Sequence, residues 1–139
     1  VGENLNPPAA VLRQLSNDDD PRVRAGVAEN INMPADLMRK LSNDVEPVVR
    51  MGVAINSSAP EEILRKLSTN EDERVRMAVA INANTPAEVL AKMADDKRAD
   101  MRQIVAENPN TSAETLKKLA ADKNSWVREL ARNNANFRE

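Results

Sequence analysis

The stretch NANTPAEVLAKMADDKRADMRQIVAE, residues 82–107, contains two helical patterns separated by a polar turn. Thr85 and Glu88 lie three residues apart on either side of Pro86, which is typical of a helix start with a threonine cap, a capping box and a proline at the first position. Apolar residues then follow at helical spacing as far as Met93. We therefore expect one helix before the acidic turn and a second helix after it.

The same unit recurs along the chain with a period of 26 residues and no insertion. An asparagine column repeats at this interval, at Asn4, Asn30, Asn56, Asn82, Asn108 and Asn134. We expect these asparagines to end the second helices, either in left-handed geometry or through hydrogen bonds to loop backbone. A fixed period of this length indicates stacked structural repeats.

The period divides a single domain, residues 1–139, into five full repeats. They cover residues 4–29, 30–55, 56–81, 82–107 and 108–133, after the tail of a preceding repeat at 1–3 and before residues 134–139, which begin a sixth repeat or end the domain. One repeat cannot bury enough apolar surface to fold alone, so we predict an all-α protein, an α-solenoid of two-helix repeats. Because the chain opens inside a repeat, we also expect a fragment of a longer array, or end-to-end packing with another copy.

The second helix of each repeat is expected to be short, about eight to ten residues, and the pattern leaves open whether it is α-helical or 3₁₀. Its start is clearest in NDDDPRVRAGVAEN, residues 17–30, where Asp20 caps and Pro21 takes the first helical position. The acidic run lacks the glycine and the distal glutamate of a calcium-binding EF-hand loop, so capping rather than metal binding is expected.

Composition argues against several classes of activity. The chain has no cysteine and no histidine, which rules out disulfides, thiol nucleophiles, cysteine-bound metals and histidine acid–base catalysis. A net charge of −2 and only two aromatic residues, Trp126 and Phe137, argue against a nucleic-acid partner. No apolar run approaches the length of a membrane span. We predict a cytoplasmic protein with no membrane partner, no enzymatic activity, no cofactor and no metal.

The repeat resembles a known family. The pattern N-x-N-T-P-x-E-V-L, then L/M-A-x-D, then V-R-x-x-V-A, in residues 82–106 and 108–128, resembles the leucine-rich repeat variant family. The resemblance covers essentially the whole chain and implies a HEAT-like solenoid in which an α-helix alternates with a short 3₁₀ helix. It implies no activity, because the family is described by its repeat. One arrangement in the family adds a cysteine-bound iron–sulfur module, which a chain without cysteine does not contain.

An aspartate stands six positions before an arginine in four of the five repeats. The aspartates are Asp18, Asp44, Asp96 and Asp122, and the arginine column is Arg24, Arg50, Arg76, Arg102 and Arg128. Asn70 interrupts the aspartates, and Asp72 is near enough to substitute. A row of guanidinium groups can bind phosphate or carboxylate. A regular acidic partner, which the similarity to HEAT repeats also implies, favours a structural ladder instead.

A basic column on the first helices has acidic residues four positions before it. The lysines are Lys40, Lys66, Lys92 and Lys118, and the acidic residues are Asp36, Glu62, Glu88 and Glu114. This order predicts ion pairs within each helix and a solvated helix face rather than a binding site.

Positions that vary between repeats indicate a partner-binding surface. If Val23 and Val27 mark the buried side of an α-helical second helix, three other positions face outward. In the second repeat these positions carry Val48, Met51 and Ile55, and in the third repeat they carry Arg74, Met77 and Ile81. In the fifth repeat the first of the three positions carries Trp126. The alternative is that a 3₁₀ twist turns Ile55 and Ile81 into the core.

These patterns predict a non-catalytic helical-repeat scaffold that binds a protein or peptide through its second-helix surface, because a methionine-containing apolar strip suits such a partner. One alternative is a HEAT-like nucleic-acid-binding protein, which would need a basic, aromatic-bearing face. The other is an accessory module of a larger enzyme. End-to-end self-association through uncapped terminal repeats is a further expectation.

Overall fold

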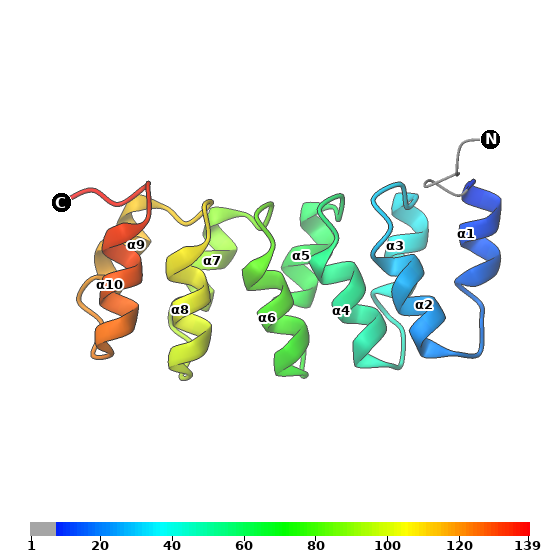
Figure 1. Cartoon of the computed structure of the whole chain (residues 1–139), viewed down its shortest axis with the longest axis horizontal. Coiled ribbons are helices and arrows are strands. Elements are labelled where there is room, and N and C mark those ends of the chain that lie inside the picture. The colour runs from blue at the N-terminus through cyan, green and yellow to red at the C-terminus, as the bar shows by residue number, and fades with distance from the viewer. Residues whose placement is uncertain (1–7) are drawn as a thin grey trace.

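The computed structural model describes residues 8–139, which form ten α-helices arranged as five pairs (Figure 1). The first helices are α1 (Ala9–Leu15), α3 (Ala35–Leu41), α5 (Glu61–Leu67), α7 (Ala87–Met93) and α9 (Ala113–Leu119). The second helices are α2 (Pro21–Ala28), α4 (Pro47–Ile55), α6 (Glu73–Ile81), α8 (Ala99–Glu107) and α10 (Ser125–Asn133). The predicted all-α solenoid of two-helix repeats is confirmed. The predictions for residues 1–3 and for Asn4 lie outside the described residues.

The helices form two layers, and the chain runs along the array from one end to the other (Figure 1). The second helices lie side by side in the layer that faces the viewer, and α3, α5, α7 and α9 lie behind them. The core between the layers is aliphatic, with fully buried side chains such as Leu64, Leu90 and Leu116. Each repeat therefore completes its core with its neighbours, as solenoid stacking requires.

The second helices are α-helical and eight or nine residues long, so the 3₁₀ alternative is wrong. The expected start of α2 is confirmed, because the side chain of Asp20 accepts a hydrogen bond from the backbone N–H of Arg22 at 2.9 Å, and Pro21 is the first helical residue. Asp72 and Asn124 cap α6 and α10 in the same way. A capped α-helix keeps every third or fourth residue on one face.

The expected start of the first helices is wrong by one residue. The backbone carbonyl of Pro86 accepts the first helical bond, from the N–H of Leu90 at 3.1 Å, so Pro86 is the residue before the helix. Thr85 is fully buried, and its hydroxyl donates to the carbonyl of Val79 at 2.6 Å. The threonine does not cap the next helix. It satisfies a carbonyl near the C-terminal end of the preceding one, where carbonyls lack helical partners.

The asparagine column forms a buried ladder between successive repeats. The Nδ2 of Asn82 donates to the carbonyls of Ala54 and Asn56, at 2.8 and 2.9 Å, and its Oδ1 accepts from the N–H of Asn84 at 2.8 Å. The same three bonds recur at Asn56, Asn108 and Asn134. The left-handed alternative is wrong, because no residue of the described chain has a positive φ. The amides act instead as connectors between repeats.

Candidate binding surface

The apolar positions of α4 and α6 face outward from the second-helix layer. Ile55 and Ile81 are 48% and 53% exposed, so the alternative that they turn into the core is wrong. Met51 and Met77 are half-buried and pack against the core. Aliphatic side chains at the C-terminal ends of two adjacent helices are therefore open to solvent.

These side chains line a shallow apolar depression of about 240 Å³ between α4 and α6. The lining residues are Met51, Ile55, Arg74, Met77, Ala78 and Ile81. The structure thus brings together five of the seven residues that the sequence nominates for partner binding. Val48 is exposed near the start of α4, outside this lining.

Trp126 lies on α10, separated from α6 by α8 (Figure 1). Its side chain is 52% exposed and does not line this depression. The structure therefore does not bring Trp126 together with the apolar residues of α4 and α6.

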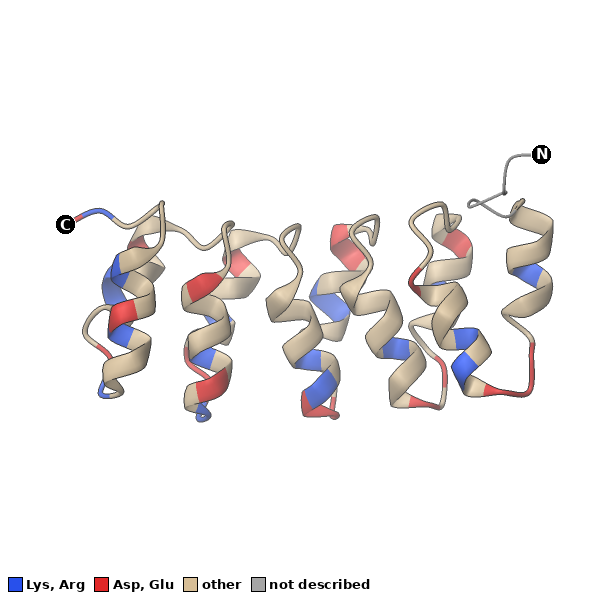
Figure 2. Ribbon diagram, in the orientation of Figure 1, with Lys and Arg blue, Asp and Glu red and all other residues tan. Residues whose placement is uncertain are grey.

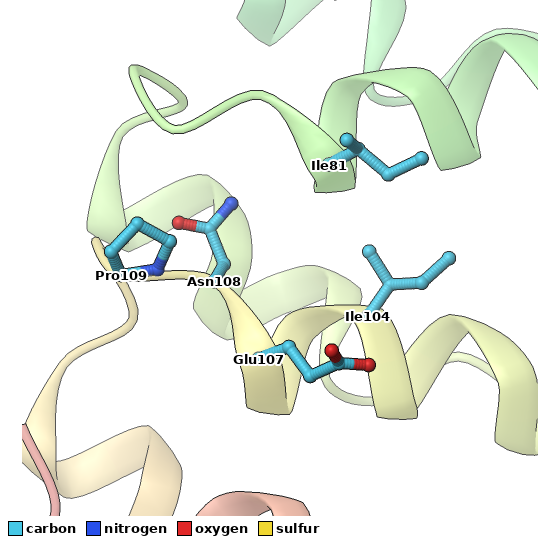
Figure 3. Close-up of a pocket in the computed structure, with 5 residues that line it drawn as sticks. All are labelled: Ile81, Ile104, Glu107, Asn108 and Pro109. Carbon is cyan, nitrogen blue, oxygen red and sulfur yellow. The ribbon is translucent and has the colours of Figure 1, made fainter. Parts of the chain in front are cut away.

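A second depression of about 170 Å³ adjoins the first at Ile81 (Figure 3). Ile81 of α6 faces Ile104 and Glu107 of α8, and Asn108 and Pro109 complete the lining. Ile104 was not predicted from the sequence, because its position carries glycine or alanine in the first three repeats. The appearance of a large aliphatic residue in a column of small ones was the available signal.

The size of the residue in this column affects how closely the second helices approach. A Cβ on Gly52 would lie 2.9 Å from both the carbonyl oxygen of Ala25 and the Cβ of Ala28, so α2 and α4 are in close backbone contact. The column continues with the small Ala78 in α6 and the larger Ile104 in α8. A small residue at this position therefore lets the two helix backbones approach closely.

Three arginines near the N-terminal ends of the second helices, Arg22, Arg74 and Arg98, are paired with carboxylates of the chain. Arg74, which lines the first depression, bonds Asp72 through Nε and Nη2 at 3.2 and 2.9 Å. Hydrogen bonding by Arg74 lowers the pKa of Asp72 to about 2, and the carboxylate in turn raises the pKa of Arg74. Asp20 pairs with Arg22 in the same way, and Arg98 pairs with both Glu73 and Asp100. The cationic charge beside the apolar residues is therefore largely neutralised.

The arginine column connects neighbouring turns. The Nε and Nη2 of Arg24 bond Asp44 of the next repeat at 2.8 and 3.1 Å, while Nη1 donates to the carbonyl of Asp18 in its own repeat at 2.8 Å. Arg102 makes the equivalent bonds to Asp122 and to the carbonyl of Asp96. Asp18 and Asp96 thus contribute their carbonyls to the arginine of their own repeat, and Asp44 and Asp122 contribute their carboxylates to the arginine of the preceding repeat.

The ladder is interrupted in the middle of the array. Arg50 would meet Asn70, which offers no carboxylate, and the Nε of Arg50 is buried without a partner among the described residues. Asp72 does not substitute, because it pairs with Arg74. Arg76 and Arg128 retain the bonds to turn carbonyls in their own repeats.

Replacing Asn70 by aspartate should therefore stabilise the chain at pH 7, by about 1 kcal/mol after the desolvation cost, because the buried Nε of Arg50 gains a charged acceptor. Burial raises the pKa of Asp44 and Asp122, but hydrogen bonds from Arg24 and Arg102 outweigh it and the net shift is downward. A lowered pKa means that the gain is complete above about pH 4 and is lost as the pH falls through the folded-state value.

Urea unfolding at pH 7 and at pH 2.5, compared with wild type, measures this difference. An equal stability of the Asn70→Asp variant and the wild type at pH 7 would contradict the ladder as a source of stability.

The arginines of the first helices pair with acidic residues of the next repeat, and Arg65 also bonds Glu61 of its own helix at 3.3 Å. Arg13 bonds Asp36 at 2.8 Å, Arg39 bonds Glu62 at 2.5 Å, and Arg65 bonds Glu88. The expected pairs of these acidic residues with lysines four positions later do not form. Lys66 reaches the Ser42 hydroxyl and the Asn43 side chain of the preceding repeat. Adjacent first helices lie side by side, so each arginine fork meets a carboxylate of the next repeat.

No group of three or more acidic side chains in residues 8–139 is arranged to hold a metal ion. None of the ten helices has the length and apolarity needed to cross a bilayer.

Comparisons with known proteins extend these observations. The sequence model of the leucine rich repeat variant family matches residues 99–124, which run from the start of α8 to the turn after α9. A solved structure described as a leucine-rich repeat variant with a novel repetitive structural motif aligns with 92% of this chain at 25% identity and a TM-score of 0.47, and the chain spans 62% of its length. The structure of an engineered protein aligns with 91% of this chain and 82% of its own at 19% identity and a TM-score of 0.52, a likeness of fold alone. No curated protein matches the chain. The resemblance inferred from the sequence is confirmed, because residues 99–124 match the leucine rich repeat variant family.

Proposed function

We propose that this helical-repeat scaffold is non-catalytic and binds a protein or peptide through the surface of α4 and α6. The observation that carries the proposal is the apolar depression between these helices, with Ile55 and Ile81 half exposed on it. Contiguous exposed aliphatic side chains are uncommon on a protein surface unless they bind something. The depression is also held by helices packed on the core, so little ordering is needed when a partner binds.

The pairing of charges supports a protein or peptide partner over nucleic acid. Arg22, Arg74 and Arg98 each pair with a carboxylate on the same surface. A phosphate backbone requires cations that are available to neutralise it. Aliphatic contacts from a peptide need no such cations.

Replacing both Ile55 and Ile81 by aspartate should abolish binding of peptides that are selected on the wild-type chain from a displayed random library. Buried against a partner, each isoleucine contributes about 1.5–3 kcal/mol, and a carboxylate in its place would be desolvated without a partner. Fluorescence anisotropy of the selected peptides gives the affinities.

Val45→Asp is the matched control, because Val45 is 83% exposed and lies in the turn before α4, away from the depression. This control should bind like wild type. Circular dichroism should show the same helical content and melting temperature for all three proteins. Undiminished peptide binding by the Ile55→Asp, Ile81→Asp protein would refute the proposed surface.

A further inference from the structure

We infer that the segment bound on this surface carries aliphatic side chains and, about four residues away, a lysine or arginine that pairs with Glu107 of α8. The inference rests on the proposed function and specifies the chemistry of the partner. It follows from the continuity of the two depressions and from the distribution of charge around them.

The two depressions form one track across three helices. Ile81 lines both, so the apolar surface continues from Met51 and Ile55 of α4, over α6, to Ile104 of α8. Ile55, Ile81 and Glu107 are the last residues of α4, α6 and α8 respectively. A segment that follows this row crosses the helices and reaches a carboxylate as soon as it leaves the aliphatic residues.

The charge at this end of the helices is negative and unpaired. The C-terminal halves of α4 and α6 carry no charged residue, whereas α8 ends on Glu107 (Figure 2). Glu107 is exposed, lines the second depression, and forms no ion pair with any residue from 8 to 139. Glu29 occupies the equivalent position next to α2 and is also exposed. Arg22, Arg74 and Arg98 lie at the opposite, N-terminal ends of α2, α6 and α8, and each already has an acidic partner. A basic side chain therefore complements the open end of the track.

The spacing follows from the geometry of the layer. Adjacent packed helices lie about 8–10 Å apart, so the distance from the centre of the first depression to α8 is roughly 14 Å. An extended chain advances about 3.3 Å per residue, and this distance corresponds to about four residues. The expected segment has its aliphatic anchors between α4 and α6 and its basic residue over Ile104.

Selection of random 12-residue displayed peptides tests this inference, with the full chain and its Ile81→Asp and Glu107→Lys variants as separate baits. Peptides that are retained by wild type and lost on Ile81→Asp should carry aliphatic residues with lysine or arginine about four positions away. Glu107→Lys should shift the selected charge from basic to acidic. For individual wild-type peptides, Glu107→Gln should weaken binding about threefold, in the range of an exposed ion pair.

Glu129→Lys provides the matched control for the charge change. Glu129 is an exposed glutamate of α10 outside both depressions, so its replacement should leave the selected charge basic. A selected pool without a preference for basic residues, or one that Glu107→Lys leaves unchanged, would overturn the inference while the proposed function stands. A pool that does not distinguish wild type from Ile81→Asp would refute the proposed function itself. A dimer in sedimentation that Ile81→Asp abolishes would assign the track to a second copy of the chain and overturn the inference.

Discussion

Replacing Asn82 by alanine should lower the free energy of unfolding by about 3 kcal/mol, because two buried carbonyls and one N–H lose their partner. The carbonyls belong to Ala54 and Asn56, and the N–H belongs to Asn84. The lost bonds join one repeat to the next, so the unfolding transition should also become less cooperative. Urea denaturation followed by circular dichroism measures both effects.

Two substitutions test whether the loss of stability comes from the buried hydrogen bonds of Asn82 and not from any change at this site. Asn82→Asp keeps an acceptor for the N–H of Asn84 but directs a carboxylate at two carbonyl oxygens, so its loss at pH 7 should be at least as large. Asn84→Ala removes one bond, to the carbonyl of Ser57 at 2.6 Å, at an exposed edge and should cost less than about 1 kcal/mol. A loss for Asn82→Ala no greater than that of Asn84→Ala would show that the ladder contributes little.

Gly52→Ala should destabilise the chain by about 2 kcal/mol, because the added methyl group overpacks the contact between α2 and α4. The new Cβ would lie 2.9 Å from the carbonyl oxygen of Ala25. This oxygen is a backbone atom of α2, so relieving the contact requires α2 to move away from α4. The expected loss is opposite in sign to the usual effect of removing a glycine from a helix.

Gly26→Ala is the matched control, since the same substitution one repeat earlier meets nothing within 4 Å. Gly26→Ala should stabilise the chain by about 0.5–1 kcal/mol through helix propensity alone. Thermal or urea unfolding of both variants gives the comparison. Changes of the same sign and size at both glycines would contradict the close approach of α2 and α4.

Much of the fold could be predicted from the regular columns of the sequence. A strict period places equivalent residues in equivalent environments, so the alternation of helices, the aliphatic core and the start of α2 at Asp20 and Pro21 follow from one repeat. The same reasoning nominated Ile55 and Ile81 as outward-facing residues, because an α-helix of known buried side determines which positions remain.

The choice of partner for each polar group was not predictable in this way. Glu88 follows Thr85 at capping-box spacing and precedes Lys92 by four residues, yet it pairs with Arg65 of the preceding repeat. Thr85 likewise bonds a carbonyl of the preceding helix. Spacing along the chain describes contacts within one helix, whereas these contacts are made across the interface between repeats.

Local periodicity and capping chemistry act over a few residues, and the amino-acid sequence by itself was therefore enough to establish an all-α solenoid and to nominate an apolar strip. Only the structure decided that Ile55 and Ile81 of this strip face solvent and not the core. The extent of that strip depended on how closely neighbouring helices approach, and this distance is set jointly by the two helices in contact. Gly52 allows close contact with α2, whereas Ile104 is larger and lines the track beside Glu107. Only the stacked structure shows this, because the effect of a side chain's size on helix spacing depends on which residues of the neighbouring helix it contacts.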